Sequence, residues 1–335
     1  MEFSKIISTL RGKTMCYSAM VEQDIKKLGL KKGDIIDVAQ FRELFRRRFE
    51  GESIYIPKAM EANFLDDVKT TAEKECKKLI LDYRTSKISE EETKMFGYKK
   101  RLNEAEKKLK EKATKGAQKE KEVCERQLDK CKHRLERLQT NKLSEGDSRI
   151  YPMGWAPMMI LKNDQRVIVP VRYHLRPQGQ KEDFDYKYNG NYNARRESLE
   201  KVFWWKNIFG KNHGIIKIHR FYENVPKSKF EKTKLKKGEE DQNVVLEFEP
   251  SNHEPMYVAV IYDTWPNAKN LEYYSAAAIT MHPPPEIAET GHERCIIPIP
   301  AELIDSWLEG GKSLSEYYAI LDKRVISFYK HKLAA

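Results

Sequence analysis

The sequence predicts an α+β protein: a β-rich domain with peripheral helices, interrupted by an inserted α-helical hairpin. Two observations support this fold class. Short runs of β-type residues cluster after residue 150, whereas the chain from 58 to 142 is rich in Lys and Glu and has no proline. In addition, 34% of the residues are charged, which exceeds the usual quarter and is typical of a long solvated element beside a packed core.

The first elements follow from local patterns. Residues 15–20 (MCYSAM) are small and apolar enough for a buried strand. Phe41, Leu44 and Phe45 then repeat at helical spacing, and Asp37 precedes them as a helix N-cap. We therefore expect a strand near the start of the chain, followed by a helix over residues 38–49.

The Lys- and Glu-rich region carries two narrow apolar stripes at a spacing of three and four. The first consists of Leu102, Ala105 and Leu109, and the second of Cys124, Leu128, Cys131, Leu135 and Leu138. Such stripes indicate two helices that pack along one seam, with the turn expected at Gly116. Cys124 and Cys131 are expected in this seam as core residues and not as metal ligands.

The second half of the chain is expected to be β-rich. Short strands are predicted at residues 167–171, 214–218, 244–248, 257–262 and 276–280. Helices are predicted over residues 194–205, 300–308 and 314–322. The predicted organisation is an N-terminal extension or propeptide (1–14), one catalytic domain from two segments (15–66 and 146–335), and the hairpin insertion (67–145).

Charge and cysteine content narrow the function classes. The net charge of +11 makes a polyanion partner plausible, with nucleic acid ahead of a membrane surface. No apolar run approaches the length of about 18 residues that a membrane span needs. Five cysteines without a CxxC pair indicate free thiols, and we expect a cytoplasmic, DNA-associated protein without metal or other cofactor.

Several polar residues could carry chemistry, although each also has a structural interpretation. The candidates are Cys16, Asn193, Arg195, Glu223 and His292. A cysteine near the N-terminus is usually packing, an Asn before a helical pattern can be a cap, and a Glu at a strand end is often exposed. Their spacing alone leaves both interpretations open.

The order of six short motifs resembles the SOS response-associated peptidase family, also called abasic-site processing proteins. The motifs are Met15-Cys16-Tyr17-Ser18, Met153-Gly154-Trp155-Ala156-Pro157, Arg172-Tyr173-His174-Leu175-Arg176-Pro177, Asn193-Ala194-Arg195-Arg196-Glu197, Phe221-Tyr222-Glu223 and Gly291-His292-Glu293-Arg294-Cys295. The resemblance covers about residues 15–57 and 146–310. The family pattern differs at Tyr17-Ser18, where it has Gly-Arg, at Gly154, where it has Asn, and at Asn224, where it has Trp.

The resemblance implies a function and roles for these residues. An exposed N-terminal Cys16 would react with abasic sites in single-stranded DNA and form a thiazolidine crosslink. Glu223 would act as acid and base, His292 would move protons, and Asn193 would hold the N-terminal residue. Arg195 would bind a phosphate, with Arg172, Tyr173 and Trp155 as further DNA contacts, although core packing is the better interpretation of Trp155.

The fifteen residues before Cys16 leave three alternatives open. Translation starts at Met15 and the methionine is removed, the chain cleaves itself before Cys16, or the extension stays and the crosslinking chemistry is lost. Two other functions also remain. One is a thiol hydrolase or peptidase with Cys16 as nucleophile and His292 as base, and the other is a non-enzymatic nucleic-acid-binding scaffold. The hairpin is a solvated spacer, an extension of the DNA footprint or a site for a protein partner.

Overall fold

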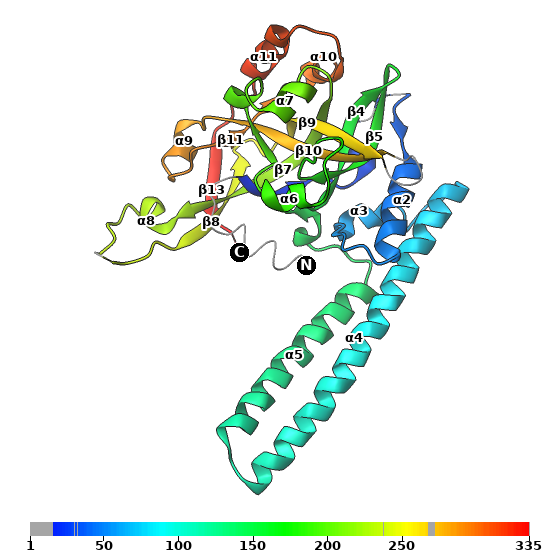
Figure 1. The fold of residues 1–335 in the computed structure, drawn as a ribbon, viewed down its shortest axis with the longest axis vertical. Helices are drawn as coiled ribbons and strands as arrows, with labels where there is room; N and C mark the ends of the chain where they lie inside the picture. Colours follow the sequence, from blue (N-terminus) through cyan, green and yellow to red (C-terminus); the bar gives the residue numbers. More distant parts are fainter. Residues whose placement is uncertain (1–15, 30, 32, 237, 267–271, 335) are drawn as a thin grey trace.

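The computed structural model describes residues 16–29, 31, 33–236, 238–266 and 272–334 (Figure 1). The expected extension of residues 1–14 lies outside the described residues. In the described part, thirteen strands form one sheet: β1 Cys16–Val21, β2 Ile35–Ile36, β3 Arg149–Ile150, β4 Trp155–Lys162, β5 Gln165–Tyr173, β6 Asn193–Arg195, β7 His213–Pro226, β8 Asn243–Pro250, β9 Met256–Pro266, β10 Glu272–Met281, β11 Cys295–Ile296, β12 Pro298–Ile299 and β13 Tyr329–Leu333. These strands and the helices around them confirm the α+β fold class.

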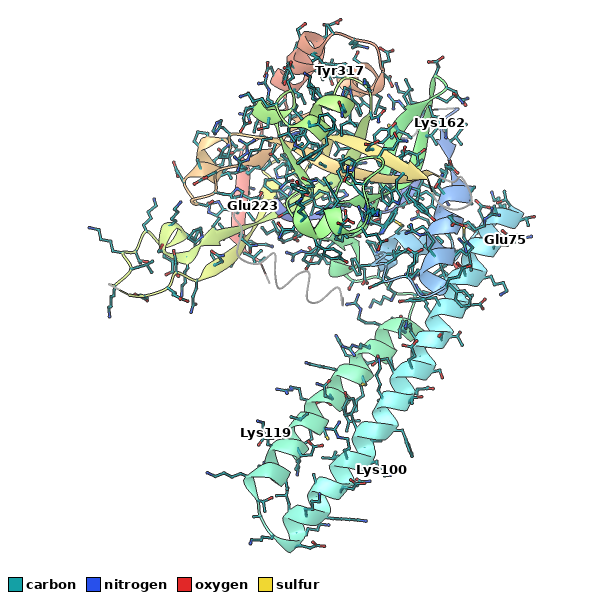
Figure 2. All side chains as sticks on the ribbon, viewed as in Figure 1. Glu75, Lys100, Lys119, Lys162, Glu223 and Tyr317 are labelled. Atoms are coloured by element: carbon teal, nitrogen blue, oxygen red, sulfur yellow. The ribbon has the colours of Figure 1, made fainter. Side chains whose placement is uncertain are left out.

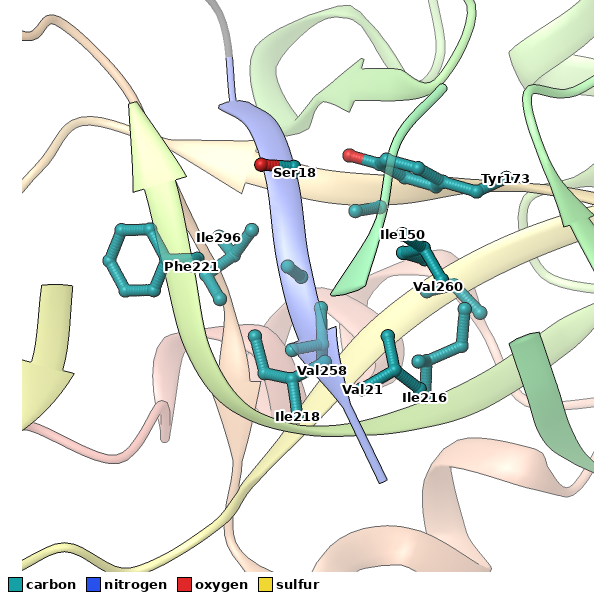
Figure 3. A pocket seen from close by; sticks show the side chains of 12 residues that line it. Ser18, Val21, Ile150, Tyr173, Ile216, Ile218, Phe221, Val258, Val260 and Ile296 are labelled. Atoms are coloured by element: carbon teal, nitrogen blue, oxygen red, sulfur yellow. The ribbon is translucent and has the colours of Figure 1, made fainter. Parts of the chain in front are cut away.

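Five strands close into a barrel, in the order β9, β10, β5, β4 and β7. The ring closes because β7 also pairs with β9, in a register that sets His213 opposite Ile261. Most neighbours are antiparallel, but β5 runs parallel to β10. The barrel is filled by side chains, and the cavity between its inner face and β1 measures only about 30 Å³ (Figure 3).

The barrel strands are apolar on both faces, which explains their unbroken hydrophobic runs. Along β5, Val167, Val169 and Val171 point into the barrel, whereas Ile168 lies in a second core on the outer face. Helices α2 Val38–Phe49, α3 Lys58–Ala62, α7 Phe203–Ile208, α10 Ile304–Leu308 and α11 Leu314–Asp322 contribute residues to this outer core. The shorter helices are α6 Asp183–Lys187, α8 Lys227–Phe230, α9 Pro285–Ala288 and the 3-10 turns η1 Ile25–Lys27, η2 Glu145–Ser148, η3 Arg196–Ser198 and η4 Ala301–Leu303.

A long helical arm projects from this body (Figure 1). Helix α4 spans Thr71–Glu111 and α5 spans Lys115–Gln139, and the two pack side by side with Ala105, Cys124 and Cys131 buried between them. Both helices start at a threonine cap. Thr70 forms a capping box with Glu73, and the Thr114 side chain accepts a hydrogen bond from the Ala117 N–H.

The base of the arm is fixed to the body by buried charges. Glu61 of α3 accepts from Arg48 of α2 at 2.6 Å and from Arg84 of α4 at 2.5 Å, and all three side chains are less than 8% exposed. The Arg48 guanidinium also lies 4.1 Å from the centre of the Tyr83 ring. Arg84 donates to Asn141 Oδ1 at 2.8 Å, and thereby ties the start of the arm to the chain that leaves it.

Two predicted elements are wrong in their detail. The turn of the arm lies at residues 112–114 and not at Gly116, because Thr114 caps α5 and Gly116 falls inside its first turn. Residues 194–205 do not form one helix. Asn193–Arg195 is strand β6, held parallel to β10, and a 3-10 turn separates it from α7. Among the described helices, none is long and apolar enough to cross a membrane.

Candidate functional site

The strand at the start of the described chain places Cys16 next to the acidic candidate. Strands β1 and β7 pair in antiparallel fashion, and Cys16 lies directly across from Glu223. A register shift between Cys16 and Ser18 marks an irregularity, of the kind that re-aims residues near functional sites. Cys16 is placed by its backbone alone, since its side chain lies outside the described part of the structure.

Glu223 and His292 form a fully buried acid–base pair. Glu223 Oε2 lies 3.1 Å from His292 Nε2, and both side chains are 0% exposed. On its other side, His292 Nδ1 donates to the Arg294 carbonyl at 2.7 Å. Burial lowers the pKa of His292, against the smaller opposite effect of that backbone hydrogen bond. The ring is therefore neutral, with its Nε2 lone pair facing the Glu223 carboxyl group.

Arg294 connects this pair to a second motif. Its guanidinium donates to the Glu197 carboxylate at 2.5 and 3.0 Å, and to the Thr280 carbonyl at 2.7 Å. Burial opposes the negative charge of Glu197, but the bonds from Arg294 outweigh it and lower the pKa of Glu197. A continuous chain of contacts therefore runs from Glu197 through Arg294 and His292 to Glu223.

The end of strand β10 brings these sequence-distant residues together. β6 pairs with β10 so that Arg195 lies opposite Thr280, and β11 pairs with the same end, with Ile296 opposite Thr280. The segment of Asn193 and Arg195 and the segment of His292 and Arg294 thus meet where one strand ends.

A pocket of about 460 Å³ opens at this place. Its walls carry the cations of Arg195, Lys229 and Arg294 together with His292, and the carboxylates of Glu197 and Glu293. Arg195 is exposed, and Lys229 is 54% exposed in its side chain. Arg294 pairs with Glu197, and Lys229 lies 4.0 Å from Glu293, which leaves Arg195 as the cation of the wall that is best placed for an anionic ligand.

Gly291 shapes the wall just before His292. Its φ of +91° is a backbone conformation that side chains rarely adopt, and a Cβ there would lie 2.7 Å from Lys229 Cβ. The lysine stem packs against the bare glycine, and larger residues at 291 would displace it.

The other predicted residues lie apart from this pocket. The Tyr173 hydroxyl donates to Asn193 Oδ1 at 3.1 Å, and its ring, 7% exposed, lines the barrel cavity with the hydroxyl end toward β1 (Figure 3). Trp155 is 3% exposed in the outer core, in line with its core-packing interpretation. Arg172 is 6% exposed and donates to Asp185 at 2.8 and 3.1 Å, so its guanidinium binds a buried carboxylate inside the protein.

Sequence reasoning missed three residues of the pocket. Arg294 and Glu197 stood inside the quoted motifs, but only their contact in space shows that one holds the other. Lys229 lies in the short helix α8, within a lysine-rich segment between β7 and β8 that contains no motif. Among the described residues, no group of three or more His, Cys, Asp or Glu side chains could hold a metal ion.

Comparisons with known proteins bear on this site. A family model described as SOS response associated peptidase (SRAP) matches residues 112–331, about two thirds of the chain, and leaves out β1, α2 and all of α4. No curated protein matches the sequence. The family match supports abasic-site processing and DNA interaction at the level of the family.

The solved structures that match are only distantly related to this chain in sequence. A protein from Bordetella bronchiseptica has a TM-score of 0.44 at 16% identity and covers 56% of this chain and 87% of its own. A protein from Bacteroides thetaiotaomicron has 0.44 at 15%, covering 56% and 77%, and a phage-related protein from Bordetella bronchiseptica has 0.42 at 16%, covering 56% and 80%. On the family match, the chain belongs to the SOS response associated peptidase family.

Proposed function

We propose that this protein processes abasic sites in single-stranded DNA by forming a covalent thiazolidine through Cys16. The observation that carries the proposal is the β1–β7 register, which sets Cys16 across from Glu223, itself 3.1 Å from His292. A nucleophile next to a buried acid–base pair is the arrangement that covalent catalysis requires. The basic pocket beside the pair adds a place for the phosphates that flank the lesion.

The chemistry needs both nucleophiles of an N-terminal cysteine. An abasic site presents an aldehyde, and a free α-amine with a pKa near 8 is partly neutral at pH 7 and adds to it. Loss of one water gives an imine. The thiol of the same residue then adds across the C=N bond, and the resulting five-membered ring resists hydrolysis better than the imine does. Glu223 protonates the departing hydroxyl and afterwards accepts a proton.

The α-amine of Cys16 must first be released from its peptide bond with Met15. In one route, the Cys16 thiol attacks the Met15 carbonyl, so that a thioester forms and the C–N bond breaks. Glu223 protonates the leaving nitrogen, and water hydrolyses the thioester. In the other route, translation begins at Met15 and the methionine is removed. Both routes end in the same reactive N-terminus.

DNA recognition is assigned to the exposed part of the site. Arg195 is the candidate for a phosphate contact because it is exposed and lines the pocket. Tyr173 and Asn193 act as a positioning pair near the start of β1, since the tyrosine hydroxyl holds the amide oxygen. Arg172 and Trp155 are left out of the DNA contact, because both are buried.

The test compares the full chain with a form that begins at Cys16. Each is incubated with single-stranded DNA that carries one abasic site, then analysed on a denaturing gel and by intact mass. The expected result is a heat-stable adduct with the mass of protein plus DNA minus one water. An adduct from the full chain as well indicates self-cleavage.

Two variants and one substrate serve as controls. Cys16→Ala should give no heat-stable adduct, and undamaged DNA should give none with the native protein. Cys16→Ser keeps the amine but lacks the thiol, so its product should survive only after chemical reduction of the imine. A folded protein that forms no adduct from either starting form contradicts the proposal. Turnover of peptides or esters that Cys16→Ser abolishes would then favour a thiol hydrolase.

A further inference from the structure

The distal end of the helical arm concentrates positive charge far from the candidate site. Residues 99–121 contain ten lysines and arginines and four glutamates, so this end holds more than half of the net charge of +11. Figure 2 shows Lys100 and Lys119 on the two helices of the arm, well away from Glu223 in the body.

Most of these cations form no ion pair in the described structure, although Glu104 and Glu111 lie among them in the sequence. Arg101 pairs with Glu120 at 2.8 Å and Lys121 with Glu106 at 3.6 Å. In the described structure, the remaining lysines of this end make no ion pair, and all of them are exposed: Lys99, Lys100, Lys107, Lys108, Lys110, Lys112, Lys115 and Lys119. Eight exposed cations on adjacent turns repel one another and favour a bound polyanion.

The apolar residues of this end are used inside the arm. Ala105 and Ala117 are buried between the helices, and Leu102 and Leu109 are half-buried on the same seam. Of the described residues from 99 to 121, no large apolar side chain is exposed. A membrane surface usually requires such side chains to insert among lipids, so the composition favours a purely electrostatic partner.

The arm also has the reach to extend a footprint on DNA. Helix α5, with 25 residues, is about 37 Å long at 1.5 Å per residue. This length corresponds to about 11 nucleotides of B-form DNA at 3.4 Å each. The buried contacts of Glu61 with Arg48 and Arg84 hold the arm at a fixed base.

We propose that residues 99–121 form a second nucleic-acid contact that binds the phosphate backbone about one helical turn away from the base of the arm. The choice of DNA as the polyanion rests on the function proposed above. Binding here is independent of sequence and of the lesion, and it strengthens with falling salt concentration.

The test measures binding of the full chain to undamaged DNA of about 40 nucleotides, single- and double-stranded, by fluorescence anisotropy over a range of salt. One variant, called the tip variant because its changes lie at the distal end of the arm, replaces four lysines by glutamine: Lys107, Lys108, Lys110 and Lys115. The matched control replaces four exposed lysines elsewhere by glutamine: Lys69, Lys74, Lys130 and Lys132. Glutamine keeps the helix propensity and the control removes the same net charge.

The tip variant should bind at least about tenfold more weakly at 0.1 M salt, with a salt slope reduced by about 0.7–0.9 for each lost phosphate contact. The control should stay within about threefold of the native protein. Equal losses in the two variants, or no loss in either, would overturn the proposal. So would tip-dependent binding to phosphatidylserine vesicles with unchanged DNA binding.

A second measurement separates this inference from the proposed chemistry. Adduct formation at limiting DNA is compared on abasic single strands of about 10 and about 60 nucleotides. The tip variant should match the native rate on the short strand and fall behind on the long one. If the native protein forms no adduct at all, the proposed chemistry fails, whereas the anisotropy result still decides whether the tip binds DNA.

Discussion

At the scale of single residues, the contact between Glu223 and His292 constrains where one proton lies. His292 uses its Nδ1–H on the Arg294 carbonyl, so the Nε2 of the neutral ring carries a lone pair, and it lies 3.1 Å from Glu223 Oε2 without hydrogen-bond geometry. Burial lowers the pKa of His292 and so disfavours a proton on the ring. In the proposed reaction, a protonated Glu223 carboxyl group would be the acid that protonates a leaving nitrogen or oxygen beside Cys16.

Glu223→Gln tests this assignment directly. Glutamine has nearly the same shape and fits the same place beside His292, but it cannot exchange a proton. We expect adduct formation to slow by about 10²- to 10⁴-fold, the usual contribution of a general acid or base. The measurement is a single-turnover time course with the form that begins at Cys16. A rate within threefold of native, in a variant with a native circular dichroism spectrum, contradicts the acid–base role.

Glu197→Gln tests the positioning chain one step further out. The Arg294 guanidinium would lose its charged partner, and the Arg294 carbonyl that holds His292 would be less firmly placed. We expect a loss of about tenfold in rate, smaller than for Glu223, together with a shifted acidic limb of the pH–rate profile. Glu302→Gln serves as a matched control, since Glu302 is exposed in η4. An unshifted profile would leave Glu197 with a purely structural role.

The sequence could indicate part of this site but not its geometry. Cys16, Glu223 and His292 were candidates from their motifs, and the structure brings the last two into contact. Arg172 and Trp155 looked equally suited to bind DNA, yet both are buried. Burial depends on which strands pair, and a motif carries no information on that.

At the scale of elements, local signals predicted helices well wherever the helix end is decided locally. The predicted helices over 38–49 and 314–322 match α2 and α11, which begin at capping side chains of Asp37 and Ser313. The predicted helix over 194–205 is wrong because β10 offers its backbone to Asn193–Arg195. Pairing with the distant strand β10 overrides the helical spacing of this segment, and the sequence of the segment alone does not predict that pairing.

The base of the arm supplies a stability prediction. Glu61→Gln leaves the buried guanidinium groups of Arg48 and Arg84 without their carboxylate. Breaking a buried ion pair from one side costs about 3–5 kcal/mol, because the remaining charge stays desolvated. We expect the free energy of unfolding, measured with urea, to fall by that amount.

An exposed ion pair on α4, the helix that carries Arg84, is the control for that variant. Lys78 and Asp82 lie 2.6 Å apart, but their side chains are 76% and 38% exposed. Asp82→Asn should change the free energy of unfolding by less than about 1 kcal/mol. A similarly small effect of Glu61→Gln would mean that the arm detaches without disturbing the body.

At the scale of the whole molecule, the architecture follows from strands that are apolar on both faces. One face fills the barrel and the other packs against the helices, so β4, β5, β7 and β9 each serve two cores. The sequence predicted most of these strands, but not the closure of the barrel. The barrel closes because β7 pairs with β9, although β8 lies between these two strands in the sequence. Local sequence patterns do not predict such a long-range pairing.

Two further histidines besides His292 are buried in these cores with lowered pKa values. Burial lowers the pKa of His213 to about 4, although the Trp307 carbonyl bound to its Nδ1 opposes the shift. Its Nε2 accepts a hydrogen bond from the Gly210 N–H, which a protonated ring could not do. Burial likewise lowers the pKa of His174, against the opposing effect of Asp185.

These histidines predict how stability depends on pH. Their ordinary pKa near 6.5 applies to the unfolded chain, so below that value the unfolded chain binds more protons than the folded one. The free energy of unfolding should therefore fall as pH falls from about 7 toward 4, and His213 alone should account for about 2 kcal/mol at pH 5. Carboxylates with lowered pKa, such as Asp185, add their effect only below about pH 4.

Urea unfolding of the full chain at a series of pH values between 7.5 and 5 measures this dependence, with His213→Gln as the informative variant. The variant is expected to be less stable at pH 7.5, because it loses the ring that stacks on Trp307 at 4.1 Å. Its stability should nevertheless fall less steeply on acidification than that of the native protein, since one group that must stay neutral has been removed. Equal slopes in the two proteins would mean that His213 is protonated in the folded state, and that the Gly210 hydrogen bond to its Nε2 is absent in solution.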